Sequence, residues 1–191
     1  MKEEIPTPQE IMDFISASAK DAKYAWCKDS EGMADTPPML MGQFPDGAGF
    51  MMPDLSEGHP TDHLPEMLSA LLEAMEEKNG TAEYAWLAYV VEGYIKSSKD
   101  EMPEDWKRGD LAQEYKENAG SEVREGIICT FYPWEGECLA LTIPFVVGDN
   151  GLPVFDKTLE DDGAGVGGGT IPTIFEGFRK FCGIRVSAKN N

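Results

Sequence analysis

Two histidines have the spacing of a pair of metal ligands. His59 and His63 are four residues apart in the segment His-Pro-Thr-Asp-His, which also contains Asp62. On one helix this spacing presents two imidazole nitrogens to the same ion. Pro60 stands between the histidines, however, in a turn that leads into a predicted helix, where Asp62 suits the N-cap position. We therefore favour a solvated loop with helix capping and assign no metal site.

A glycine-rich loop at residues 161–170 partly matches two phosphate-binding motifs. The G-x-G-x-x-G spacing is formed by Gly163, Gly165 and Gly168. The phosphate-binding lysine of a P-loop is replaced by Gly169, and the acidic residues 160–162 would repel a phosphate. Only 21 residues follow Thr170, which is too few for the βαβ unit of a dinucleotide site. We interpret the loop as a flexible linker or gate and predict no cofactor.

Glu92 is the one acidic residue within an otherwise apolar stretch, which makes it the first candidate for a raised pKa and for acid–base catalysis. We favour the alternative that a strand ends at Glu92-Gly93, so that the carboxylate reaches solvent. No G-x-S-x-G elbow is present, and neither histidine lies near a serine or cysteine in a known local signature. No catalytic residue is assigned, although a site assembled only in three dimensions stays open.

The charge of the chain bears most directly on its partners. There are 35 acidic and 16 basic residues among 191, for a formal net charge of −19. Phosphate recognition depends on clusters of Lys and Arg, so nucleic acid and anionic membranes are disfavoured as partners. A partner protein with a basic surface fits this charge, and so does a strongly solvated surface without a partner.

Residues 97–121 read as an acidic insertion between strands, with a short helix expected from Asp110 to Asn118. Loops of this length are uncommon in compact domains unless they have a function or are mobile. Trp106 is an aromatic side chain in this polar segment, where aromatics often anchor contacts. The predicted interaction residues are Asp100, Glu101, Glu104, Asp105, Trp106, Asp110, Glu114 and Glu117.

The remaining totals describe a soluble protein of one domain, residues 1–191. No apolar run approaches the roughly 20 residues of a membrane span, and the acidic N-terminus lacks the features of a secretory signal. The four cysteines form no C-x-x-C pair. We therefore expect free thiols in a reducing compartment and a cytoplasmic location.

Helices are expected at both ends of the chain and near its middle. Thr7 and Glu10 form a capping box with Pro8 at the first helical position. The apolar stripe of this first helix is predicted at Ile11, Phe14, Ile15, Ser18, Ala19, Ala22, Ala25 and Trp26, with Lys23 on the polar side. A second helix is expected at residues 64–78, and a short final helix at 174–182 within the C-terminal segment 171–191, ended by Gly183.

The predicted strands include one whose two faces are both apolar, as in a sheet that is covered on both sides. A strand at 83–95 is apolar on both faces and is predicted to be central. A two-residue turn at Glu135-Gly136 would place Phe131 opposite Ala140 and Cys129 opposite Thr142. The other strands are expected at 39–44 and 50–55, at 123–133 and 137–147, and at 152–155.

This order of elements predicts the α+β class: a single domain with a mainly antiparallel sheet of about five to six strands and two or three packed helices. The leading functional hypothesis is a non-enzymatic interaction or accessory protein. It would bind a basic, nucleic-acid-handling protein as a nucleic-acid mimic or inhibitor. A structural or assembly subunit, as in a virion, and a small enzyme with a carboxylate-based site remain as alternatives. The sequence leaves the oligomeric state open.

Overall fold

The computed structural model describes residues 6–29, 36–45, 47–51, 60–96, 110–117, 123–156, 159–161 and 170–189. Its helices are α1 (Pro8–Asp29), α2 (Pro60–Asn79), α3 (Asp110–Glu117) and α4 (Thr170–Lys189). Its strands are β1 (Met39–Phe44), β2 (Gly47–Met51), β3 (Trp86–Lys96), β4 (Val123–Pro133), β5 (Leu139–Val147), β6 (Pro153–Phe155) and β7 (Leu159–Asp161).

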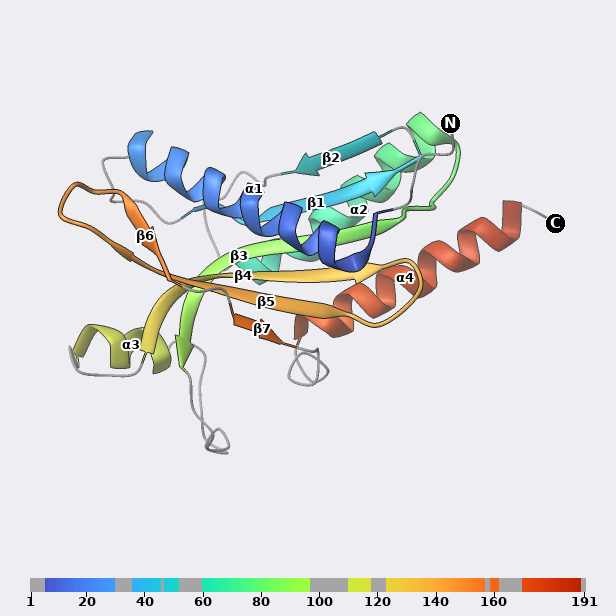
Figure 1. Ribbon diagram of the computed structural model, residues 1–191. Coiled ribbons are helices and arrows are strands. Elements are labelled where there is room, and N and C mark those ends of the chain that lie inside the picture. Colours follow the sequence, from blue (N-terminus) through green and yellow to red (C-terminus); the bar gives the residue numbers. More distant parts are fainter. Residues whose placement is uncertain are drawn as a thin grey trace.

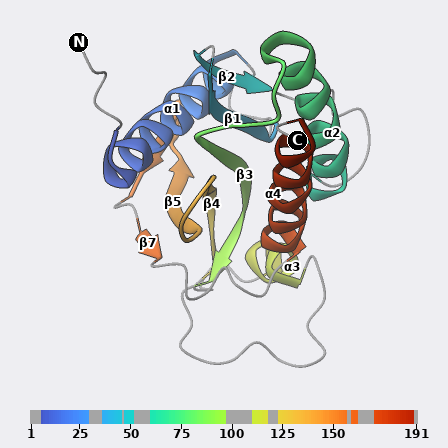
Figure 2. The same ribbon diagram turned by 90° about the vertical axis from the view of Figure 1, so that its right-hand side faces the viewer.

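All of the described strands belong to one antiparallel sheet. The strand order is β2-β1-β3-β4-β5-β6, and β7 pairs with the other half of β5. Helix α1 covers one face of the sheet, while α2 and α4 lie side by side on the opposite face (Figures 1 and 2). The short helix α3 contacts β3 and β4 at one end of the sheet. The predicted α+β class and antiparallel sheet are confirmed.

Strand β3 is central, as its two apolar faces predicted. It pairs with β1 on one side and with β4 on the other. Its alternate side chains enter two separate hydrophobic clusters: Trp86, Ala88 and Val90 face α1, whereas Leu87, Tyr89 and Val91 face α2 and α4. Tyr89 is completely buried. A strand covered on both sides lacks the usual alternation of apolar and polar residues.

The N-terminal end of α1 has the predicted capping box. The Thr7 hydroxyl accepts a hydrogen bond from the Glu10 amide at 3.3 Å, and the Thr7 amide donates to the Glu10 carboxylate at 2.8 Å. The Thr7 hydroxyl also donates to the Glu10 carboxylate at 2.8 Å. The bonds that the Thr7 amide and hydroxyl donate to the carboxylate lower the pKa of Glu10, because they stabilise its charged form.

The predicted stripe of α1 is partly wrong. Phe14, Ala25 and Trp26, which were expected to be buried, are exposed, whereas Lys23 is buried. Most of the buried residues of α1 are four residues apart. Each such step turns the side chain by 40° beyond one full turn of the helix, so the buried stripe winds around α1 as the helix crosses the twisted sheet. The buried residues of α1 are Ile11, Met12, Ile15, Ala19, Lys23 and Cys27.

The connection between β4 and β5 is wider than predicted, and the register of the hairpin differs by one residue. Five residues, 134–138, lie between the strands, so Cys129 is opposite Leu141 and Phe131 is opposite Leu139. Contacts from elsewhere in the chain hold this loop: Arg179 of α4 donates to the carbonyl oxygens of Pro133 and Gly136. Local turn chemistry could not reveal these contacts.

Two helices are longer than their sequence signals indicated. Helix α2 begins at Pro60, so Asp62 lies in its first turn rather than at the N-cap. Helix α4 continues through Gly183 to Lys189. Val186 packs against the cluster beneath α4, and the Lys189 ammonium donates to the Gly80 carbonyl oxygen at 3.0 Å. These tertiary contacts outweigh the preference of glycine for ending a helix.

Candidate functional site

We predicted that the Glu92 carboxylate reaches solvent, but the structure shows that it is largely buried. Strand β3 continues four residues beyond it to Lys96, and the Glu92 side chain is 10% exposed. The Lys23 ammonium, 3% exposed, lies 2.9 and 2.8 Å from the two carboxylate oxygens. The Thr36 amide donates a third hydrogen bond to the carboxylate at 2.9 Å. Both oxygens of Glu92 are therefore occupied by partners within the chain.

Lys23 also contacts an aromatic ring. Its ammonium lies 4.7 Å from the centroid of the Phe145 ring on β5, a cation–π distance. The ion pair thus joins α1 to β3 across the sheet face that α1 covers. A carboxylate held in this way has a structural role between two elements, since both of its oxygens bind groups of the same chain.

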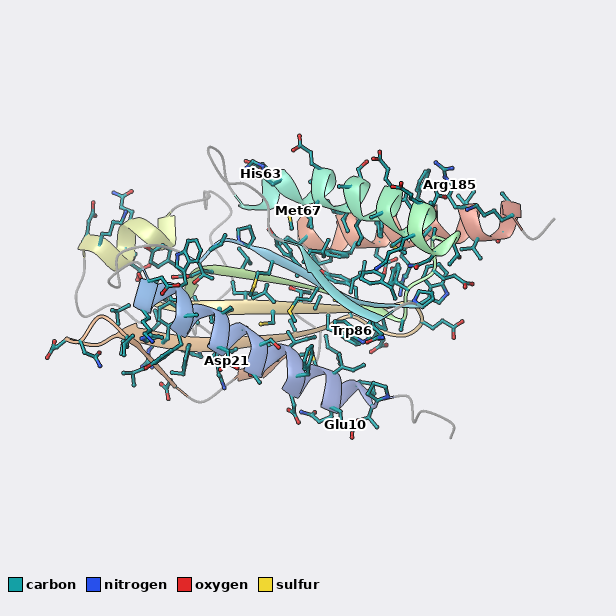
Figure 3. The ribbon with its side chains drawn as sticks, turned by 90° about the horizontal axis from the view of Figure 1, so that it is seen from above. Glu10, Asp21, His63, Met67, Trp86 and Arg185 are labelled. Carbon is teal, nitrogen blue, oxygen red and sulfur yellow. The ribbon has the colours of Figure 1, made fainter. Side chains whose placement is uncertain are left out.

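The candidate metal ligands are not brought together with Glu92. Asp62 is exposed and His63 half-buried on α2, on the opposite side of the sheet from α1 (Figure 3). His59 lies outside the described residues. Among the residues that the structure describes, no three His, Cys, Asp or Glu side chains could together hold a metal ion.

The two described hollows do not include these candidate residues either. One of about 630 Å³ lies between the end of α1 and the β5–β6 turn, lined by Cys27, Lys28 and residues 147–152. The other, of about 350 Å³, lies beside the first half of α1. A carboxylate enzyme would need Glu92 or the histidines to converge on a pocket. Glu92 and His63, the two of these residues that the structure describes, lie on opposite faces of the sheet.

The acidic insertion is only partly described. Asp110, Glu114 and Glu117 lie on α3, as the short-helix prediction expected, and Glu117 accepts a hydrogen bond from the Gln113 amide at 2.9 Å. The other predicted interaction residues, Asp100, Glu101, Glu104, Asp105 and Trp106, lie outside the described residues. So do residues 162–169 of the glycine-rich loop, while Asp161 ends β7.

A second acidic surface, which was not predicted, lies on α2. Asp62, Glu66, Glu73 and Glu77 are all exposed. Their spacings of four, seven and four residues place them within about 60° of one another around the helix and over roughly 22 Å of its length. Oxygen-tipped side chains stand along the outer side of α2 in Figure 3. We call these four residues the acidic ridge.

The helical period could have revealed the ridge. The buried residues of α2, which include Leu64, Leu68 and Met75, define the face toward the sheet. The face opposite this stripe carries the ridge, and α2 contains a single basic residue, Lys78. The acidic ridge was therefore predictable from the polar side of this helix.

Comparison of the chain with protein-family models, with curated proteins and with solved structures gave no match. No described helix is both long enough and apolar enough to span a bilayer.

Proposed function

We propose that this protein is a non-enzymatic interaction protein that binds a basic protein through the acidic ridge of α2. The observation that carries the proposal is the alignment of four exposed carboxylates along one face of one helix. Complementary surface charge accelerates association and selects partners, and clustered charges act together where scattered ones do not.

The state of Glu92 supports a binding function over catalysis. Its two oxygens accept three hydrogen bonds from Lys23 and Thr36, so the carboxylate would have to break a buried ion pair before it could accept a substrate proton. The net charge of −19 supports a basic partner in particular. In the sharper form of the proposal, the ridge imitates nucleic acid and occupies a cationic groove of a nucleic-acid-handling protein.

Affinity capture from a host lysate tests the proposal when it is run with two matched variants. The ridge variant carries Asp62→Asn, Glu66→Gln, Glu73→Gln and Glu77→Gln. The off-ridge variant carries the same change in charge at four other exposed carboxylates, as Asp21→Asn, Asp29→Asn, Glu135→Gln and Glu137→Gln.

We expect a basic protein to be captured by the wild type and the off-ridge variant, to be lost with the ridge variant, and to elute as salt rises. A captured protein that is retained equally by all three would contradict the role of the ridge. Competition by duplex DNA for the captured protein separates a nucleic-acid mimic from a general acidic binder.

A further inference from the structure

The Tyr132 hydroxyl is buried and makes no hydrogen bond within the described part of the chain. Tyr132 is 5% exposed. Its ring is stacked on the ring of Phe175, with the centroids 3.8 Å apart and the planes within 6° of each other, so the packing fixes the position of the hydroxyl. An unpaired buried donor is costly, and its presence in a well-packed cluster calls for an explanation.

The Cys138 thiol, which is half-buried, lies beside this hydroxyl. In the β4–β5 hairpin Phe131 is opposite Leu139, so the next residues along the two segments are Tyr132 and Cys138. Both side chains pack in the cluster beneath α4. Burial raises the pKa of the thiol, and the neighbouring Tyr132 hydroxyl lowers it. The thiol directs its own proton to the Leu139 carbonyl oxygen at 4.0 Å.

The Tyr132 hydroxyl is a permanent donor that faces a poor acceptor. Burial raises its pKa well above the ordinary 10.0, so it keeps its proton at every physiological pH. The sulfur of a thiol accepts hydrogen bonds only weakly. An oxygen atom bound to that sulfur would be a much better acceptor, and it would end the isolation of the buried hydroxyl.

We infer that Cys138 is a site of oxidation by hydrogen peroxide, and that the Tyr132 hydroxyl binds the oxygen of the sulfenic acid that forms. The Cys138 sulfur attacks one peroxide oxygen, and an S–O bond forms as the O–O bond breaks. The leaving hydroxide takes up the thiol proton and departs as water. The sulfur loses two electrons and the peroxide gains them.

Access separates Cys138 from the other three cysteines, because Cys27, Cys129 and Cys182 are buried. Cys182 is the closest comparison. It too lies near a tyrosine hydroxyl without a hydrogen-bond partner, that of Tyr84. Cys182 is 0% exposed, however, so peroxide cannot reach it in the native protein. The Tyr84–Cys182 pair therefore serves as an internal control for the effect of access.

The charges that face Cys138 are those of Glu176 and Arg179 on α4. These two side chains form an ion pair with each other. Glu176 raises the pKa of the thiol and Arg179 lowers it, so their effects oppose each other. Burial keeps the thiolate scarce, and the thiolate is the form that reacts. Oxidation of Cys138 should therefore be slow, and the lifetime of its product should be the distinguishing property.

Trapping with dimedone, which reacts with sulfenic acids, tests the inference. Native protein is treated with hydrogen peroxide at neutral pH, the excess peroxide is removed, and dimedone is added after increasing delays. Peptide mass spectrometry then locates the adduct and gives the lifetime of the sulfenic acid. We expect the adduct at Cys138 and none at the three buried cysteines. Cys138→Ser should give no adduct.

Two matched variants test the role of the hydroxyl. Tyr132→Phe removes the hydroxyl and keeps the ring, and Tyr84→Phe makes the same change at the other buried tyrosine. The sulfenic acid of Tyr132→Phe should decay about tenfold faster than that of the wild type, since a hydrogen bond to a charged oxygen is worth a factor of this order. Tyr84→Phe should match the wild type. Before oxidation, Tyr132→Phe should be at least as stable to urea as the wild type, because it removes an unpaired donor.

The inference is overturned if peroxide modifies the buried cysteines as readily as Cys138, or if Cys138 gives a disulfide or no dimedone adduct. Equal decay rates in Tyr132→Phe and the wild type would overturn the role of the hydroxyl. The acidic ridge takes no part in these measurements, so the proposed function and this inference can each fail without the other.

Discussion

Lys23 and Glu92, 69 residues apart in the chain, form a buried ion pair in which the ammonium lies within 2.9 Å of both carboxylate oxygens. The pair connects the third quarter of α1 to the central strand. Removing one member of such a pair leaves an uncompensated buried charge, which typically destabilises a protein by about 3–5 kcal/mol.

A double-mutant cycle on this pair is the first prediction. Lys23→Met and Glu92→Gln should each lower the free energy of unfolding by about 3 kcal/mol, because each leaves the other group buried without its partner. The double variant should cost at least about 1 kcal/mol less than the sum of the two. Urea unfolding followed by circular dichroism measures all four proteins. Additive effects would show that the two groups do not interact as the structure has them.

Stability should fall at alkaline pH. Burial raises the pKa of the Cys129 thiol from 9.0 to about 12 and that of Cys182 to about 11, and it raises the pKa values of Tyr84, Tyr89 and Tyr132 above their ordinary 10.0. The folded state therefore keeps protons that the unfolded chain releases above pH 9. This contribution is complete below pH 9 and is lost as pH rises toward 11 or 12.

Urea midpoints measured at pH 8, 9, 10 and 11 check this prediction. We expect the free energy of unfolding to drop by about 2 kcal/mol or more over this range. Cys129→Ala removes one of the shifted groups and should make the decline shallower, although the variant starts from a lower stability. A free energy that stays constant from pH 9 to pH 11 would contradict the burial of these groups.

The four thiols should differ in reactivity. Cys27, Cys129 and Cys182 are buried, whereas Cys138 is half-buried in the loop between β4 and β5. Burial raises the pKa of Cys138 as well, so it should react more slowly than a free thiol but before the others.

Alkylation with iodoacetamide at pH 8, followed by peptide mass spectrometry, gives the order of labelling. Cys138 should be modified first in the native protein, and all four cysteines should be modified in denaturant. Early modification of Cys27 would instead show that the C-terminal end of α1 detaches from the sheet, which the Lys23–Glu92 pair should prevent.

Much of the fold was predictable because its elements have strong local signals. The capping box at Thr7 predicted a helix that forms, and the two apolar faces of β3 predicted a central strand. The Lys23–Glu92 pair was not predictable in the same way. From the sequence, a lysine on a helix and a glutamate in a strand are each expected to face solvent. Only the crossing of α1 over β3 gives each charge its partner.

Other differences have the same origin. The loop between β4 and β5 is bound by Arg179 of another helix, and α4 passes through Gly183 because residues beyond it have tertiary contacts. The ridge on α2, in contrast, follows from helical period alone. Its neighbour α4 shows why charge totals mislead, since a basic helix lies within a strongly acidic chain.

The most direct test of the central claim is the salt dependence of binding between this protein and the basic protein that it captures. The dissociation constant is measured by calorimetry at low and high salt for the wild type, the ridge variant and the off-ridge variant. We predict that the ridge variant binds about tenfold more weakly at low salt, a loss of roughly 1.4 kcal/mol, and that its affinity varies less with salt. The off-ridge variant should match the wild type. Equal affinities for the ridge and off-ridge variants at low salt would contradict the claim that α2 is the binding surface.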